Sequence, residues 1–341
     1  MSLPYPYLLF LGDVNARNRA KTALGLVHWV PEKCLGQMRL PECAADTGLE
    51  DFTFVEAVDE GAKALVIGVA PQGGAIPLAW FDALLEGVSA GLDIISGMHD
   101  RLEDVPGLKD AATAAGRQLF NVRYTDRSIP SANGVKRTGM RCLMVGLDSA
   151  LGKKWAALSL TKEMQNRGHK ATFRATGQTG IMIAGEGIAV DAVKADFIAG
   201  AAEILSPDNE ADHWDIIEGQ GSIYHAAYGG VTLGLVQGSQ PDAMVLCGHA
   251  TRDHLELLTH IPHRSYEEAI VAYEHLARVT NPNSRVVAIS VNTSGLSVDD
   301  EAMAHLADIA DRTGLPATDP IRFGAKPFAD AIEKYAAEFA S

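Results

Sequence analysis

A glycine-bounded loop with two lysines carries the clearest chemistry in the chain. It runs from Gly146 to Lys154, follows the apolar stretch 140–145, and leads into a helical pattern that begins at Lys153. In such a loop, backbone N–H groups surround one phosphate and the lysine ammonium reaches the next. We therefore predict a cofactor-binding phosphate loop made of Gly146, Asp148, Ser149, Ala150, Leu151, Gly152, Lys153 and Lys154.

The loop departs from the plain G-x-x-x-x-G-K-[ST] pattern in two ways. Its first glycine lies one residue further from Gly152 than the pattern requires, and Lys154 stands where a serine or threonine would hold Mg²⁺. Because cleavage of a γ-phosphoryl group depends on that metal, we expect the loop to hold a diphosphate-bearing cofactor, such as coenzyme A, without cleaving it.

Further polar residues follow predicted strands, at the edge where open parallel sheets bind ligands. Glu218 ends the stretch 214–218 and precedes a glycine-rich turn that contains Gln220, so it could be a general base or a metal ligand. The alternative is a carboxylate that only accepts hydrogen bonds from the turn. His249 ends another strand and is a candidate for substrate contact.

Several of these strand ends could recognise a polar substrate or a nucleoside. The stretch 174–180 offers short donors and acceptors, and 292–295 could contact an adenine or a substrate. An arginine could pair with a substrate carboxylate. The predicted substrate-binding residues are Gln178, Thr179, Arg174, Ser222, Arg252 and Arg123.

The elements that must position these residues follow an α/β pattern. Apolar runs at 7–11, 64–70 and 92–96, with a helical pattern at 79–90, predict a Rossmann-like N-terminal domain over residues 1–134. A linker rich in turn residues lies at 130–134. Strand patterns then alternate with helical ones, which predicts a P-loop-type domain with a mainly parallel sheet over residues 135–341. The strands are expected at 140–145, 170–175, 214–218, 243–247 and 286–291, and the helices at 153–167, 190–204, 266–279, 298–312 and 327–339.

Composition excludes several classes of function. The chain has 341 residues, with 29 Lys+Arg against 43 Asp+Glu, and its net charge of −14 argues against a nucleic-acid-binding protein. We find no apolar run that could cross a bilayer and no signal peptide, so we expect no membrane partner. The four cysteines form no C-x-x-C pair, which indicates reduced thiols in the cytoplasm and no metal site.

In combination, these motifs resemble the DgcN family. The resemblance rests on the loop 146–153, Ala-Thr-Gly-Gln-Thr-Gly-Ile at 175–181, the segment 191–203, and Glu-Gly-Gln-Gly-Ser at 218–222. The stretches 68–71 and 91–100 resemble the N-terminal domain of the family, so the likeness covers nearly the whole chain. The loop is also similar to that of dethiobiotin synthetase, which has threonine after the loop lysine.

The resemblance implies an N-acetyltransferase that moves an acetyl group from acetyl-CoA to the amine of D-glutamate. It implies a small-molecule substrate. We also expect a homo-oligomer and, because the hydroxyl that would hold Mg²⁺ is missing from the loop, no requirement for that metal. Glu218, or second His249, would then accept the amine proton, and the turn around Gln220, or Gln178, would stabilise the oxyanion. The arginines at 174, 252 and 123 would bind the two substrate carboxylates.

Two alternatives stay open at this point. The first is an Mg-ATP-dependent enzyme of the dethiobiotin synthetase type, in which Asp148 and Glu218 would hold the metal and a carboxylate would be activated. The second is a non-catalytic nucleotide sensor.

Overall fold

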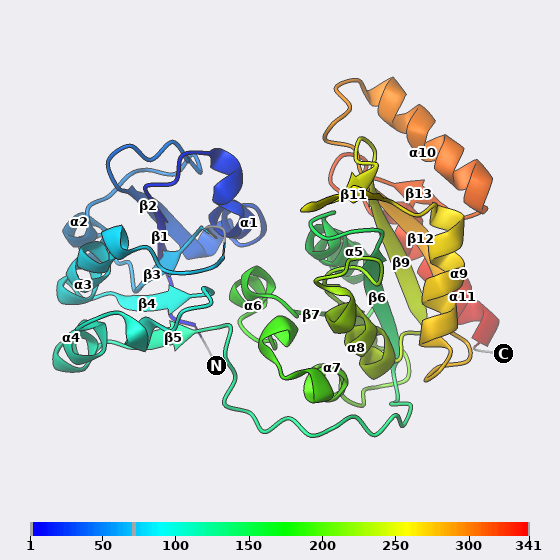
Figure 1. Ribbon diagram of the computed structural model, residues 1–341, viewed down its shortest axis with the longest axis horizontal. Coiled ribbons are helices and arrows are strands. Elements are labelled where there is room, and N and C mark those ends of the chain that lie inside the picture. Colours follow the sequence, from blue (N-terminus) through cyan, green and yellow to red (C-terminus); the bar gives the residue numbers. More distant parts are fainter. Residues whose placement is uncertain (1–2, 70–72, 340–341) are drawn as a thin grey trace. The chain divides into compact units, whose positions relative to one another are not determined.

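The computed structural model describes residues 3–69 and 73–339, and the chain separates into two compact units (Figure 1). The first unit comprises Met1–Asp126 and Gln178–Ala189, and the second comprises Arg127–Gly177 and Val190–Ser341. The domain boundary at 134/135 stays a prediction. The described residues contain no helix that is both long and apolar enough to span a membrane.

A five-stranded parallel sheet forms the centre of the first unit, in the order β2-β1-β3-β4-β5. The central strands β1 and β3 are buried along their whole length, because their apolar runs are covered on both faces. The strands are β1 (Tyr7–Gly12), β2 (Cys34–Arg39), β3 (Ala64–Ile67), β4 (Asp93–Ser96) and β5 (Leu119–Asn121). The helices are α1 (Lys21–Trp29), α2 (Phe54–Asp59), α3 (Phe81–Ala90), α4 (Leu108–Ala115) and α6 (Gln178–Ala184).

A six-stranded parallel sheet forms the centre of the second unit, in the order β13-β12-β9-β6-β8-β7. Its strands are β6 (Met140–Gly146), β7 (Ala171–Arg174), β8 (Trp214–Ile217), β9 (Ala243–His249), β12 (Arg285–Asn292) and β13 (Ala317–Thr318). The short strands β10 (His254–Leu255) and β11 (Leu258–Pro262) form a separate antiparallel hairpin. The helices are α5 (Lys153–Asn166), α7 (Ile198–Leu205), α8 (Gly229–Ser239), α9 (Tyr266–Ala277), α10 (Asp299–Thr313) and α11 (Lys326–Phe339).

The fold confirms the predicted α/β class with parallel sheets, and the predicted strands lie within a few residues of the observed ones. In the strand predicted at 64–70, Ala70 lies outside the described residues, and β3 ends at Ile67. The helix predicted at 190–204 is wrong in its first half, which forms two 3-10 turns before α7 begins. Lys194 adopts an extended backbone between the two turns, and the Val190 N–H donates to the Thr176 carbonyl.

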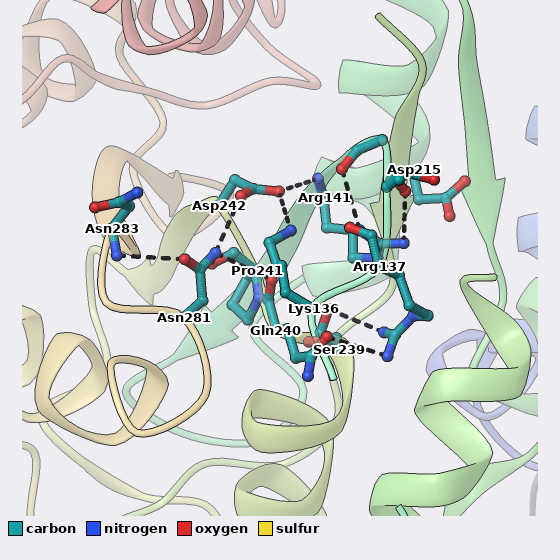
Figure 2. A network of polar contacts seen from close by, with 12 residues as sticks. Lys136, Arg137, Arg141, Asp215, Ser239, Gln240, Pro241, Asp242, Asn281 and Asn283 are labelled. Atoms are coloured by element: carbon teal, nitrogen blue, oxygen red, sulfur yellow. Dashed lines mark hydrogen bonds and ion pairs between the residues drawn. The ribbon is translucent and has the colours of Figure 1, made fainter. Parts of the chain in front are cut away.

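Buried polar contacts fix the start of β6, opposite the edge that carries the phosphate loop (Figure 2). The side chain of Arg141 is 1% exposed, and its guanidinium donates to the carbonyls of Arg137, Thr138, Gly139 and Pro207 over 2.9–3.1 Å. Its Nε donates to the Ser206 hydroxyl at 2.8 Å. The linker that precedes β6 is therefore attached to the body of the second unit.

At the other edge, the carboxyl ends of the parallel strands lie side by side. The loop after β6 follows Gly146, Glu218 follows β8, and His249 ends β9. Asn292 ends β12, and Asp319 follows β13. Because ligands bind at this edge in open α/β sheets, the candidate site lies here.

Candidate functional site

Backbone geometry shapes the phosphate loop between β6 and α5. Ala150 and Gly152 have φ of 51° and 99°, and Gly152 caps the helix that begins at Lys153. The neighbouring turn approaches closely: a Cβ on Gly219 would lie 1.7 Å from the Met144 carbonyl oxygen, so only glycine fits there. The N–H groups of the first turn of α5 therefore point out of the helix at the end of the loop, where an anion is stabilised.

Lys153 lies inside the loop rather than on the surface. Its side chain is 6% exposed, and its Nζ donates to the Asp148 carbonyl oxygen at 2.7 Å. Burial lowers the pKa of Lys153 to about 8, although the nearby Cys247, Asp148 and Glu218 groups favour its charged form. A bound phosphate would supply the counter-charge that this buried ammonium needs.

Asp148 holds the β10–β11 hairpin against the loop. Its buried carboxylate accepts the Ser149 N–H at 2.6 Å and the Glu256 N–H at 2.7 Å. The Arg252 guanidinium and the His263 Nε2 lie 3.3 Å from the same carboxylate. Burial alone would raise the pKa of Asp148, but these hydrogen bonds lower it below the ordinary value. Both carboxylate oxygens thus accept hydrogen bonds from protein donors, and through these contacts Asp148 fixes the shape of the phosphate loop.

Glu218 is a buried carboxylate next to the phosphate loop. Its Oε2 accepts the N–H groups of Thr176 and Gly177 at 3.0 Å each. A Cβ on Gly177 would lie 3.4 Å from the Glu218 Oε1 and 2.7 Å from the Gln220 amide nitrogen, so the Gln220 side chain lies close by. Burial raises the pKa of Glu218, against the Lys154 charge and the two backbone hydrogen bonds, which lower it. A carboxylate with a raised pKa can exchange protons closer to neutral pH, as a general base requires.

His249 presents one ring nitrogen to its own chain. Its Nδ1 lies 3.2 Å from the Thr251 N–H, which makes Nδ1 an acceptor and places the ring proton on Nε2. Burial, together with the charge of Arg252, lowers the pKa of His249. In this arrangement a neutral His249 is better suited to donate a hydrogen bond from Nε2 than to accept a proton there.

The other predicted residues occupy different places in the two units. Ser222 is fully buried and accepts the Tyr224 N–H at 3.2 Å, while Arg174 forms an ion pair with the buried Asp215 at 2.8 Å. Gln220 donates to the Thr176 hydroxyl at 3.1 Å beside Glu218. Arg252 lies at the loop, where it also donates to the Ser149 carbonyl. Arg123, Gln178 and Thr179 belong to the first unit, in which the Thr179 hydroxyl lies 3.0 Å from that of Thr22.

A pocket of about 570 Å³ opens beside the phosphate loop within the second unit. Its lining comes from the end of the loop, from the start of α5, from the last residues of β12, and from the chain that follows β12 and β13. The lining residues are Leu151, Gly152, Trp155, Ser290, Asn292, Ser294, Leu296, Asp319, Pro320, Ile321 and Arg322.

Sequence reasoning anticipated only part of this pocket. It included Leu151 and Gly152 in the loop and the stretch 292–295 as a possible adenine contact. It missed Trp155 as a wall and the whole segment 319–322. The signal for that segment was Asp319-Pro320 directly after a two-residue strand, which is too short for periodicity to reveal. In residues 3–69 and 73–339, no group of three or more His, Cys, Asp or Glu side chains is arranged to hold a metal ion.

Comparisons with known proteins agree with this architecture. Residues 130–329 match the model described as "Domain of unknown function (DUF1611_C) P-loop domain", and residues 39–125 match the "DUF1611_N Rossmann-like domain". A crystal structure of a DUF1611 family protein from Anabaena variabilis is similar, with a TM-score of 0.87 and 32% identity, over 97% of this chain and 100% of that one.

Two curated relatives cover nearly the full chain, and both are named D-glutamate N-acetyltransferase. The protein from Tritonibacter scottomollicae is 49% identical over 96% of this chain and 98% of its own length. The protein from Pseudoalteromonas sp. is 42% identical over 95% of this chain and 97% of its own. These findings confirm the resemblance that the motifs predicted. The chain belongs to the DUF1611 family, with its Rossmann-like and P-loop domains, as a relative of the D-glutamate N-acetyltransferases.

Proposed function

We propose that the chain transfers an acetyl group from acetyl-CoA to the amine of D-glutamate, giving N-acetyl-D-glutamate and CoA. The observation that carries the proposal is the phosphate loop with the buried Lys153, next to the buried carboxylate of Glu218, in a chain 49% identical to a D-glutamate N-acetyltransferase. The loop amides and Lys153 suit the diphosphate of acetyl-CoA.

The reaction requires a base, oxyanion donors and cations. In the proposal, Glu218 accepts the proton of the substrate ammonium, and the freed amine attacks the thioester carbonyl carbon. A C–N bond forms, the C–S bond breaks, and the departing CoA thiolate takes up the proton that the attacking nitrogen loses as the amide forms. Donors from the turn around Gln220, or the His249 Nε2–H, stabilise the oxyanion that forms in between.

Among the predicted cations, Arg252 is our choice within the second unit for a substrate carboxylate. Arg174 already neutralises the buried Asp215, whereas the side chain of Arg252 is 27% exposed at the phosphate loop. Arg123, Gln178 and Thr179, which belong to the first unit, stay predictions. Ser222 is a candidate for supporting the turn that follows Glu218, because its hydroxyl is directed into the protein.

The ATP-dependent alternative needs both Asp148 and Glu218 as metal ligands. The carboxylate of Asp148 is fully engaged by Ser149, Glu256, Arg252 and His263, which favours a positioning role for it. We therefore propose that turnover does not require Mg²⁺. The free thiols of the four cysteines fit a cytoplasmic enzyme. The homo-oligomer stays a prediction.

One assay separates acetyl transfer from ATP-dependent chemistry. The full chain is incubated with D-glutamate and either acetyl-CoA or Mg-ATP, and the release of free thiol and of ADP is followed. We expect thiol release that depends on D-glutamate and persists in EDTA, with L-glutamate as the stereochemical control. Metal-dependent ADP release without free thiol would refute the proposal.

A further inference from the structure

We infer that the pocket beside the phosphate loop binds the adenosine end of the cofactor whose diphosphate the loop holds. This inference rests on the proposed function where it names acetyl-CoA, although the chemistry it describes is shared by every adenine nucleotide. The pocket volume of about 570 Å³ falls in the range of small-molecule sites, and all of its lining belongs to the second unit.

The walls of the pocket suit a flat, weakly polar ring. The indole of Trp155 lines it from the first turn of α5, and Leu151, Leu296, Pro320 and Ile321 complete an apolar lining. A purine has two apolar faces and a polar edge, and aromatic side chains stabilise such a ring by stacking. The pocket suits an amino-acid substrate with two carboxylates less well, because its lining is mostly apolar and such a substrate has no flat ring to stack on Trp155.

The two charged side chains in the lining, Asp319 and Arg322, already form hydrogen bonds within the protein. The Asp319 carboxylate accepts the N–H and the hydroxyl of Thr293 at 2.8 and 2.7 Å, and also the N–H groups of Ile321 and Arg322. The Arg322 guanidinium donates to the Leu296 carbonyl at 2.8 Å. These contacts join the segments after β12 and β13 into one wall, which leaves recognition to neutral groups.

Asn292 supplies such a neutral group. Its Oδ1 accepts the Ser294 N–H at 3.0 Å, which fixes the amide and leaves the Nδ2 hydrogens on the other side. Among the residues that the structure describes, Nδ2 has no hydrogen-bond partner. An amide donor in an apolar pocket matches the ring nitrogen acceptors of adenine.

The order of the strands places the pocket and the phosphate loop close enough to bind two parts of one ligand. β12 lies two strands from β6, with β9 between them, so their ends are separated by about 10 Å. A ribose joins a base to its 5′-diphosphate over a comparable distance. β8 and Glu218 lie on the other side of β6. A cofactor seated in this way has its adenosine over β12 and β13, and its remaining arm leaves the loop on the side of Glu218.

The test measures binding by calorimetry on the full chain, with acetyl-CoA, adenosine 3′,5′-bisphosphate, ADP and 4′-phosphopantetheine as separate probes. Asn292→Asp keeps the acceptor for the Ser294 N–H and replaces the free donor with a charged acceptor. Asn283→Asp, at the opposite end of β12, makes the same charge change at an exposed position and is the matched control. Trp155→Leu is a second variant that removes the stacking plane but keeps an apolar side chain.

We expect Asn292→Asp to weaken acetyl-CoA and adenosine 3′,5′-bisphosphate by at least about tenfold, because a base acceptor then faces a carboxylate. Trp155→Leu should weaken both by about fivefold or more. Phosphopantetheine binding should be unchanged in both variants. Unaltered affinity for the adenine ligands in Asn292→Asp and Trp155→Leu, while Lys153→Ala weakens them, would overturn the inference, and so would failure of every adenine ligand to bind.

The two proposals fail differently. If ADP binds in a manner that depends on Asn292 but acetyl-CoA does not bind, the adenosine pocket stands and acetyl transfer is refuted. If acetyl-CoA binds and is turned over at wild-type affinity in both pocket variants, acetyl transfer stands and the pocket inference is refuted.

Discussion

Replacement of Arg141 by methionine tests how the second unit is held together. The buried guanidinium of Arg141 donates to five backbone carbonyls and to the Ser206 hydroxyl, which in turn donates to Asp215 at 2.6 Å. Methionine retains the apolar stem but leaves these carbonyls and the Ser206 oxygen without their donor. It also removes one of the positive charges near Asp215, which keeps its ion pair with Arg174. Hydrogen bonds to a charged group contribute about 1.5–3 kcal/mol each, but they are not additive within a network.

We therefore expect Arg141→Met to lower the free energy of unfolding by about 3–5 kcal/mol, which is the usual loss when a buried charged group loses its partner. Urea unfolding of the full chain measures it, and Arg312→Met is the control, because Arg312 is 46% exposed and pairs with surface carboxylates. That control should lose no more than about 1 kcal/mol. Hydrogen exchange should also accelerate at the Thr138 and Asn209 amides, which the network holds in place. Equal losses in Arg141→Met and Arg312→Met would show that the network contributes no more than a surface pair.

Three further predictions concern the candidate site. Glu218→Gln should lower kcat by about 10²–10⁴ with little change in cofactor affinity. Since the active form is deprotonated and its pKa is raised by burial, wild-type activity should fall on acidification at a higher pH than for an ordinary carboxyl, and the variant should lack this limb in a pH–rate profile. Lys153→Ala should raise the KM for acetyl-CoA by about tenfold or more. Lys162, which is exposed on the same helix, provides the control, and Lys162→Ala should leave the KM unchanged. Identical kinetics in the two variants would show that the loop does not bind the cofactor. Asp148→Ala should destabilise the chain by about 3–5 kcal/mol in urea unfolding, because buried donors lose their acceptor, while Asp253→Ala in the exposed hairpin should change stability little.

The phosphate loop could be predicted because its signal is local. Strand, glycines, lysine and helix are adjacent in the sequence, and each has a period or a conformational preference that the residue types report. Glu218 followed from the same logic at the end of β8. The partner of Arg174 could not be predicted, because Asp215 lies 41 residues away and reaches it only through the pairing of β7 with β8.

Among the elements that the sequence analysis missed, β2 (Cys34–Arg39) and α8 (Gly229–Ser239) show how tertiary contacts override the local pattern. β2 contains the buried Gln37, whose Oε1 accepts the N–H and the hydroxyl of Thr47, so a polar side chain interrupts the apolar run of a strand. α8 is rich in glycine, which disfavours a helix on propensity. Its glycines permit close approach of α7: a Cβ on Gly238 would lie 2.2 Å from the Ala199 carbonyl oxygen. Packing of the two backbones therefore stabilises a helix that the composition argues against.

The shape of the loop depends on residues that its sequence motif does not contain. The Tyr273 hydroxyl, buried in α9, donates to the Gly146 carbonyl at 2.7 Å and lies 3.3 Å from the Ile223 N–H in the turn after Glu218. Asp148 joins the same loop to the β10–β11 hairpin through the Glu256 N–H. The phosphate loop and the turn that follows Glu218 are thus held in place before any ligand binds. This reduces the conformational entropy that is lost on binding. The phosphate loop is fixed in shape, and its carboxylate, Asp148, is engaged by protein donors. Such a loop is suited to holding the diphosphate of a cofactor in one position while the chemistry takes place at the acyl end of that cofactor.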